Sequence, residues 1–61
     1  MQDDVLLTTE DVATLLNVKP RTLKQWRYER RGPRYVSLGR RIVRYRRSDV
    51  DEWIRSREKE S

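Results

Sequence analysis

Arginine is the residue type with which this sequence could do the most chemistry. In the stretch SLGRRIVRYRRSD, from Ser37 to Asp49, arginines surround a few apolar residues and follow directly on a glycine. A guanidinium group is permanently charged and forms paired hydrogen bonds with phosphate or carboxylate oxygens. The stretch therefore predicts a surface that binds an anionic partner.

Charge is distributed unevenly along the 61 residues, although the formal net charge is only +5. Residues 1 to 18 have a net charge of −4, and residues 48 to 61 have a net charge of −2. Residues 19 to 47 hold twelve Lys and Arg against one Glu, a net charge of +11. Positive charge concentrated in the middle of a chain indicates a polyanionic partner.

The residue types that are missing exclude several kinds of chemistry. The sequence has no Cys and no His, which removes disulfides, thiolate nucleophiles, imidazole catalysis and nearly every zinc site. Its carboxylates lie mostly at predicted helix starts and in the acidic tail, where no nucleophile and base are placed to meet. We therefore expect no enzymatic activity, no metal and no cofactor.

The length has room for one small domain, which we expect over residues 1–61 with an ordered core of about 6–57. Charged residues make up 41% and hydrophobic residues 34%. Such a composition is typical of disordered chains, so the prediction of an ordered domain depends on the helix and strand periodicity of the sequence. No apolar run exceeds Val5-Leu6-Leu7, so neither a secretion signal nor a membrane span is predicted. A cytoplasmic protein is expected.

Two capping boxes predict where the first and last helices begin. Thr8-Thr9-Glu10-Asp11 precedes an apolar stripe, as does Ser48-Asp49-Val50-Asp51. In each, the hydroxyl of the first residue and the carboxylate of the last can accept hydrogen bonds from backbone amides that have no partner within the helix. The predicted helices cover about residues 9 to 16 and 49 to 57. Asn17 closes the first, because asparagine adopts the left-handed conformation readily.

A second helix is predicted from about Pro20 to Glu29, since proline is favoured at a first helical position. A 100° step per residue places Thr22, Leu23 and Trp26 on one side. The opposite side carries Arg21, Lys24, Gln25 and Tyr28. Arginine can bind guanine and glutamine can bind adenine in a major groove, although a solvated helix face would show the same pattern.

Alternation in residues 34–38 and 41–45 predicts a β-hairpin. If Gly39-Arg40 forms a two-residue type II′ turn, the pairs are Leu38 with Arg41, Val36 with Val43 and Arg34 with Tyr45. The inward residues are then Val36, Leu38, Val43 and Tyr45. A three-residue turn would shift the register and place Ile42 opposite Leu38.

The hairpin arginines have two interpretations each. Arg40 and Arg41 at the tip could contact phosphates or a narrowed minor groove, or they could keep an exposed sheet edge soluble. Arg44, Arg46 and Arg47 could bind DNA or pair with nearby carboxylates of the last helix. The aromatic residues Trp26, Tyr45 and Trp53 lie on apolar faces, which favours core packing over base stacking.

Together these elements predict a mostly α fold with a small β-hairpin: a winged helix-turn-helix made of helix, turn, helix, two-stranded wing and helix. The segments LTTEDVA (7–13), LNV (16–18), RTL (21–23), LGRR (38–41) and YRRSDVDEWI (45–54) resemble the excisionase and MerR-like DNA-binding domain of phages and integrative elements. The resemblance spans roughly residues 6–56. Lys19 departs from it, because such domains often carry a Ser or Thr cap there.

The resemblance implies a sequence-specific double-stranded DNA-binding protein that binds repeated sites near an attachment sequence and bends the DNA. It also implies partners, namely further copies side by side on DNA and a phage integrase that is directed toward excision, with no membrane and no small-molecule ligand. A small MerR-like transcriptional regulator is the alternative, and a protein-interaction module is the third possibility. Regulators of this kind usually add a dimerisation or sensor segment, and no such segment is predicted within these 61 residues. The candidate DNA contacts are Lys19, Arg21, Thr22, Lys24, Gln25, Arg27 and Tyr28 around the second helix, and Arg40, Arg41, Arg44 and Arg46 in the wing.

Overall fold

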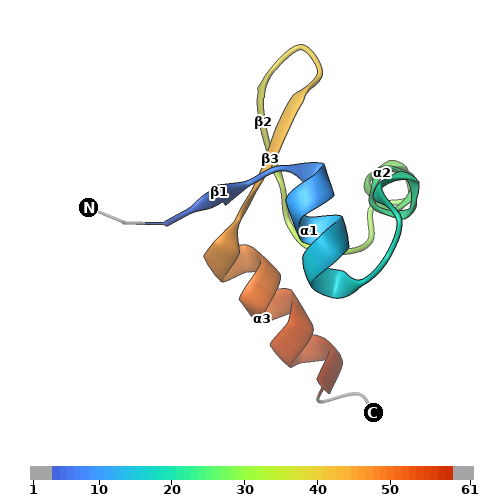
Figure 1. The fold of residues 1–61 in the computed structure, drawn as a ribbon, viewed down its shortest axis with the longest axis vertical. Coiled ribbons are helices and arrows are strands. Elements are labelled where there is room, and N and C mark those ends of the chain that lie inside the picture. The colour runs from blue at the N-terminus through green and yellow to red at the C-terminus, as the bar shows by residue number, and fades with distance from the viewer. Residues whose placement is uncertain (1–3, 59–61) are drawn as a thin grey trace.

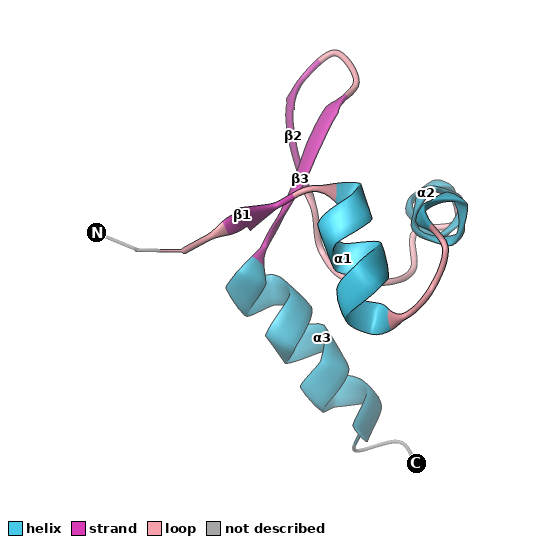
Figure 2. Cartoon of the chain, in the orientation of Figure 1, coloured by secondary structure: helices cyan, strands magenta, loops and turns pink. Residues whose placement is uncertain are grey.

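The computed structural model describes residues 4–58. In this part of the chain the elements follow in the order β1 (Leu6–Leu7), α1 (Thr9–Leu16), α2 (Pro20–Tyr28), β2 (Val36–Gly39), β3 (Ile42–Arg46) and α3 (Arg47–Glu58) (Figure 1). The predicted winged helix-turn-helix is confirmed: the structure has three helices and a small antiparallel sheet, and the β2–β3 hairpin projects away from α3 (Figure 2). Within the described residues, no helix is both long enough and apolar enough to cross a membrane.

Helix α1 begins and ends as its sequence predicts. The Thr8 side chain accepts a hydrogen bond from the Asp11 amide at 3.0 Å, and Asp11 Oδ2 accepts one from the Thr8 amide at 3.1 Å. Asn17 closes the helix in the left-handed conformation, with φ of 59°. The Val18 amide then donates to the Ala13 carbonyl at 2.9 Å, which satisfies a helix-end acceptor and turns the chain toward α2.

Helix α2 has a weaker start and a tightly built end. Lys19 makes no side-chain capping bond, and the first turn is held by Pro20 and by the Thr22 amide, which donates to the Lys19 carbonyl at 2.9 Å. At the other end the Arg31 amide donates to the Trp26 carbonyl at 2.8 Å, and Gly32 follows with φ of 87°. A side chain at Gly32 would collide with Trp26, since an added Cβ would lie 2.8 Å from Cε3 of that ring.

The sheet has a third strand that the sequence patterns did not predict. Its order is β1-β3-β2, and β1 pairs antiparallel with β3 through Leu6 opposite Arg46 and Leu7 opposite Tyr45. The Arg47 amide extends this contact by donating to the Val5 carbonyl at 2.9 Å. A strand of two residues is too short to show alternation, so its existence depends on the neighbouring strand.

The predicted type II′ turn at Gly39-Arg40 is wrong. Val36 lies opposite Arg44 and Ser37 opposite Val43, which is the register of the longer-turn alternative, while at the tip Gly39 lies opposite Ile42. The register therefore shifts between Ser37 and Gly39, and Arg41 rather than Gly39 takes the left-handed conformation, with φ of 63°. Of the four predicted inward residues, Tyr45 is buried and Val43 packs against the core, whereas Leu38 is exposed.

The predicted capping box at Ser48 is also wrong, because α3 already begins at Arg47. The Ser48 amide and hydroxyl instead donate to Asp4, at 3.2 Å to Oδ1 and 2.5 Å to Oδ2. A carboxylate 44 residues away in sequence thus takes the place of the local cap. The hydroxyl hydrogen bond from Ser48 holds the pKa of the Asp4 carboxyl below its ordinary value.

The core is small and lies where the helices meet the central strand. Its fully buried members come from α1, α2, β3 and α3: Val12, Ala13, Leu23, Tyr45 and Val50. Trp26 packs against this cluster, and its ring centroid lies 5.5 Å from that of Trp53. The interpretation of Trp26, Tyr45 and Trp53 as packing residues is confirmed, and this packing fixes the outward face of α2.

Candidate nucleic-acid interface

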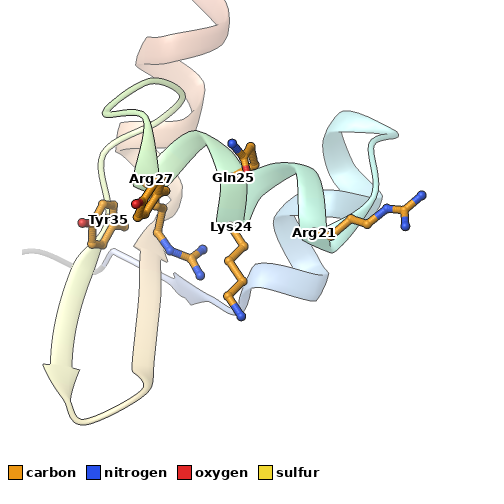
Figure 3. A pocket seen from close by; sticks show the side chains of 6 residues that line it. Arg21, Lys24, Gln25, Arg27 and Tyr35 are labelled. Atoms are coloured by element: carbon orange, nitrogen blue, oxygen red, sulfur yellow. The ribbon is translucent and has the colours of Figure 1, made fainter.

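The outer face of α2 is exposed, polar and basic. Leu23 is completely buried on the inner face, so the helical period turns Arg21, Lys24, Gln25 and Tyr28 outward, and all four are exposed. Tyr28 is 87% exposed. Figure 3 shows Lys24 and Arg27 on the same side of the helix, with Arg21 nearer its start.

A shallow groove runs along this face, and one of its lining residues was missed by the sequence patterns. The groove is lined by Arg21, Lys24, Gln25, Arg27, Tyr28 and Tyr35. Tyr35 comes from the segment just before β2 and is exposed. Its position next to the predicted inward Val36 was a usable signal, since neighbouring strand residues point to opposite faces.

Arg27 connects three parts of the fold. Its Nη1 donates to the Tyr45 hydroxyl at 2.8 Å and to Thr9 Oγ1 at 3.3 Å. Its guanidinium carbon lies 5.7 Å from the centroid of the Tyr35 ring, within the range of a cation–π contact. Arg27 is half-buried, and its contacts position α2 against β3. This role is separate from the DNA contact that the sequence predicts for it.

A second hollow joins α2 to the hairpin. Its basic lining residues are Lys24 and Arg27 from α2 together with Arg41 and Arg44 from the hairpin. Thr8, Thr9, Glu10 and Val43 complete the lining. Basic side chains from α2 and from the hairpin thus line one concavity, and lysine and arginine are the side chains that neutralise phosphates.

The arginines of the hairpin and of the first turn of α3 divide into two groups. Arg40 and Arg41 at the tip are exposed, and Arg44 donates from Nη1 to the Val43 carbonyl at 2.8 Å. Arg46 instead lies 3.8 Å from Asp49, and Arg47 lies 3.1 Å from Asp51. For these last two the alternative of pairing with α3 carboxylates is the one that the structure shows.

Few of the basic residues on this side are neutralised by the protein itself. Among residues 4–58, Arg21, Lys24, Arg40 and Arg41 form no ion pair with a carboxylate, in contrast to Arg31, Arg46 and Arg47. Gln25 is engaged, because its Nε2 donates to Glu29 Oε2 at 2.8 Å. The α2 face and the hairpin tip therefore keep exposed positive charge that no carboxylate of the described residues neutralises.

The remaining two candidate residues lie at the start of α2. Lys19 is exposed at the N-cap position, and Thr22 is half-buried one turn before Trp26. In a helix-turn-helix, the N-terminal part of the second helix enters the major groove. Both residues are therefore near the place where a duplex would meet α2, although Thr22 lies on its inner side.

The sequence profile of a family described as "Helix-turn-helix domain" matches residues 6–58. The chain belongs to this helix-turn-helix domain family. The family is a DNA-binding one that includes excisionase-like proteins and is typically non-enzymatic. Membership of this family supports double-stranded DNA as the partner of the chain. No curated protein and no solved structure matches the chain.

Proposed function

We propose that this helix-turn-helix protein is a sequence-specific DNA-binding factor of the excisionase type. It binds double-stranded DNA at repeated sites near an attachment sequence, bends the duplex and directs a phage-type integrase toward excision. The observation that supports this most strongly is the hollow in which Lys24 and Arg27 of α2 meet Arg41 and Arg44 of the hairpin. A surface of this kind straddles one phosphate backbone between two grooves.

In this proposal α2 lies in a major groove. Arg21, Lys24 and Gln25 reach base edges and the adjacent phosphates, with Tyr28 and Tyr35 at the far end of the groove along the helix. Gln25 exchanges its bond with Glu29 for a base edge, which costs little because both side chains are exposed. The hairpin crosses the backbone, and Arg40 and Arg41 bind its phosphates.

Assembly on neighbouring sites follows from the size of the contact. One recognition helix of nine residues covers few base pairs, so useful affinity requires several copies that bind side by side. The acidic segments at residues 1 to 18 and 48 to 61 then face the basic middle segment of the next copy. The resemblance of residues 6–56 to excisionases supports the same arrangement.

The deciding experiment has three parts and uses DNA from the region around the gene for this chain. Footprinting locates the bound repeats, and a circular-permutation gel measures bending. A recombination reaction with the product of an integrase gene from the same region measures excision against integration. We expect protected repeats, a bend and more excision on addition of the protein. Binding that covers a promoter and leaves both reactions unchanged would instead indicate a transcriptional regulator.

Salt dependence tests the DNA-binding step separately from recombination. If each copy neutralises about five or six phosphates, the logarithm of the observed association constant for DNA falls with the logarithm of the salt concentration, at a slope of about −5. A flat salt response on duplex DNA contradicts the proposed interface. It would favour the alternative of a protein-interaction module, whose contacts do not release counterions.

A further inference from the structure

Two large aliphatic side chains are exposed at the tip of the hairpin. Leu38 is 55% exposed and Ile42 is 44% exposed. They lie on opposite strands beside Gly39, which is paired with Ile42, and an added Cβ at Gly39 would lie 3.6 Å from Ile42 Cδ1. Both exposed side chains thus flank the turn of the hairpin, and together they are named the apolar tip.

The backbone of the hairpin holds this tip outside the core. The register shift between Ser37 and Gly39 makes Leu38 the extra residue of β2, and the hairpin projects away from α3 (Figure 2). An exposed sheet edge normally carries charged residues rather than a pair of aliphatic ones. At this projecting position Leu38 and Ile42 are available for contact with a partner.

The surroundings of the tip identify the chemistry of that partner. Arg40 and Arg41 form the turn between the two aliphatic residues, and Arg44 follows on β3. An apolar centre with a cationic rim matches a minor groove, where sugars and base edges lie between two rows of phosphates. Arg41 also lines the hollow shared with α2, so the tip continues the proposed DNA surface.

We propose that Leu38 and Ile42 form an apolar wedge that enters the minor groove next to the major-groove site of α2. The wedge partly unstacks one base step, and the bend of the duplex follows from that unstacking. Arg40 and Arg41 hold the phosphates on either side. This inference rests on the proposed DNA-binding function and adds a second, apolar contact to it.

The main test is the double variant Leu38→Ser with Ile42→Thr, bound to a duplex that the unmodified protein selects from a random-sequence library. We expect affinity to fall about tenfold, because roughly one to two kcal/mol of apolar burial is lost. The salt slope stays unchanged, since every phosphate contact is kept. A 2-aminopurine placed at each adenine in turn brightens at one step with the unmodified protein and not with the variant.

Val5→Ser is the matched control. Val5 is 58% exposed, comparable to Leu38, and lies next to β1 rather than at the hairpin tip. Its replacement leaves affinity, bending and 2-aminopurine fluorescence unchanged. Thermal unfolding of each variant checks the fold; if the double variant is unfolded, Leu38→Ser alone, at the more exposed position, replaces it.

The groove is tested by changing base pairs outside the α2 footprint. An inosine·cytosine pair keeps the minor-groove face of adenine·thymine and changes its major-groove face, whereas guanine·cytosine adds an amino group to the minor groove. We expect the first replacement to be tolerated at the wedge step and the second to weaken binding. The opposite order would overturn the assignment to the minor groove.

The outcomes separate the two proposals. If the double variant binds with unchanged affinity and unchanged 2-aminopurine fluorescence, the wedge is refuted while the DNA-binding proposal stands. If the unmodified protein selects no duplex and shows no salt-dependent binding, the proposed function fails and the wedge fails with it.

Discussion

The hydroxyl of Tyr45 accepts a 2.8 Å hydrogen bond from Nη1 of Arg27, and this bond ties α2 to the central strand of the sheet. Tyr45 is only 1% exposed, so its hydroxyl has little access to water. The same guanidinium nitrogen reaches Thr9 at the start of α1. A polar contact inside the fold therefore joins the proposed recognition helix to the strand that continues into the wing.

Tyr45→Phe tests this contact. We expect the free energy of unfolding to fall by about 1 to 2 kcal/mol, because the half-buried arginine loses a hydrogen-bond partner. Urea unfolding followed by tryptophan fluorescence measures the change. Tyr28→Phe removes a hydroxyl from a side chain that is 87% exposed and should leave stability unaltered; an equal loss in both variants would contradict the role of the Arg27 bond.

Gly32→Ala is expected to destabilise the fold by about 2 kcal/mol or more. Gly32 has φ of 87°, and the new Cβ would lie 2.8 Å from Trp26 Cε3. Gly39→Ala is the matched control, because its Cβ would meet Ile42 Cδ1 at an ordinary 3.6 Å. Thermal unfolding of the two variants gives the comparison, and equal melting temperatures would disprove the steric argument.

The Asp4 carboxylate makes stability depend on pH in the acid range. Its pKa lies below the ordinary 3.8 in the folded protein, chiefly because of the Ser48 hydroxyl. Its stabilising effect is complete above pH 3.8 and is lost as the pH falls through the lower, folded pKa.

Asp4→Asn should therefore lower the melting temperature above that window and match the unmodified protein below it. Melting temperatures measured from neutral pH down to pH 2 or so, where carboxylates protonate, make the comparison. Ser48→Ala removes the largest cause of the lowered pKa, so its own loss of stability begins at a higher pH. Parallel curves for Asp4→Asn and the unmodified protein would show that the contact does not form.

The two kinds of DNA contact predict different binding defects. Arg21→Ala should weaken binding by about 1 to 3 kcal/mol and relax preference at one base position, while Arg40→Ala should weaken all sequences alike and reduce the salt slope by about 1. Arg47→Ala is the control, since that arginine is paired with Asp51 at 3.1 Å. Competition assays on selected and random duplexes give both quantities, and an effect of Arg47→Ala equal to that of Arg40→Ala would contradict the proposed surface.

Much of the helical structure could be read from residues close together in the sequence. The capping box of Thr8 and Asp11 and the left-handed Asn17 each depend on contacts within one turn. The start of α2 at Pro20 and its amphipathic period are equally local. Such features are determined by residue type and spacing, because the groups that satisfy them are only a few residues apart.

The register of the hairpin could not be predicted from residues close together in the sequence. Glycine permits a type II′ turn at Gly39-Arg40, but β2 pairs with β3 one residue away from that register, while Val43 and Tyr45 of β3 face the core as predicted and β1 pairs along the other edge of β3. Because a slip of one residue reverses every side chain, packing of the core decides between turns that are locally similar in energy. Leu38 is exposed as a result.

The sequence by itself determined the three helices, their amphipathic faces and the concentration of positive charge in residues 19 to 47. Only the tertiary structure decided which arginines remain unpaired. Arg46 pairs with Asp49 of α3, Arg27 turns inward to Tyr45 across 18 residues, and Arg40 and Arg41 stay exposed. The reason is that charge and helical period belong to the chain, whereas the partner of a long side chain depends on which distant backbone folds beside it.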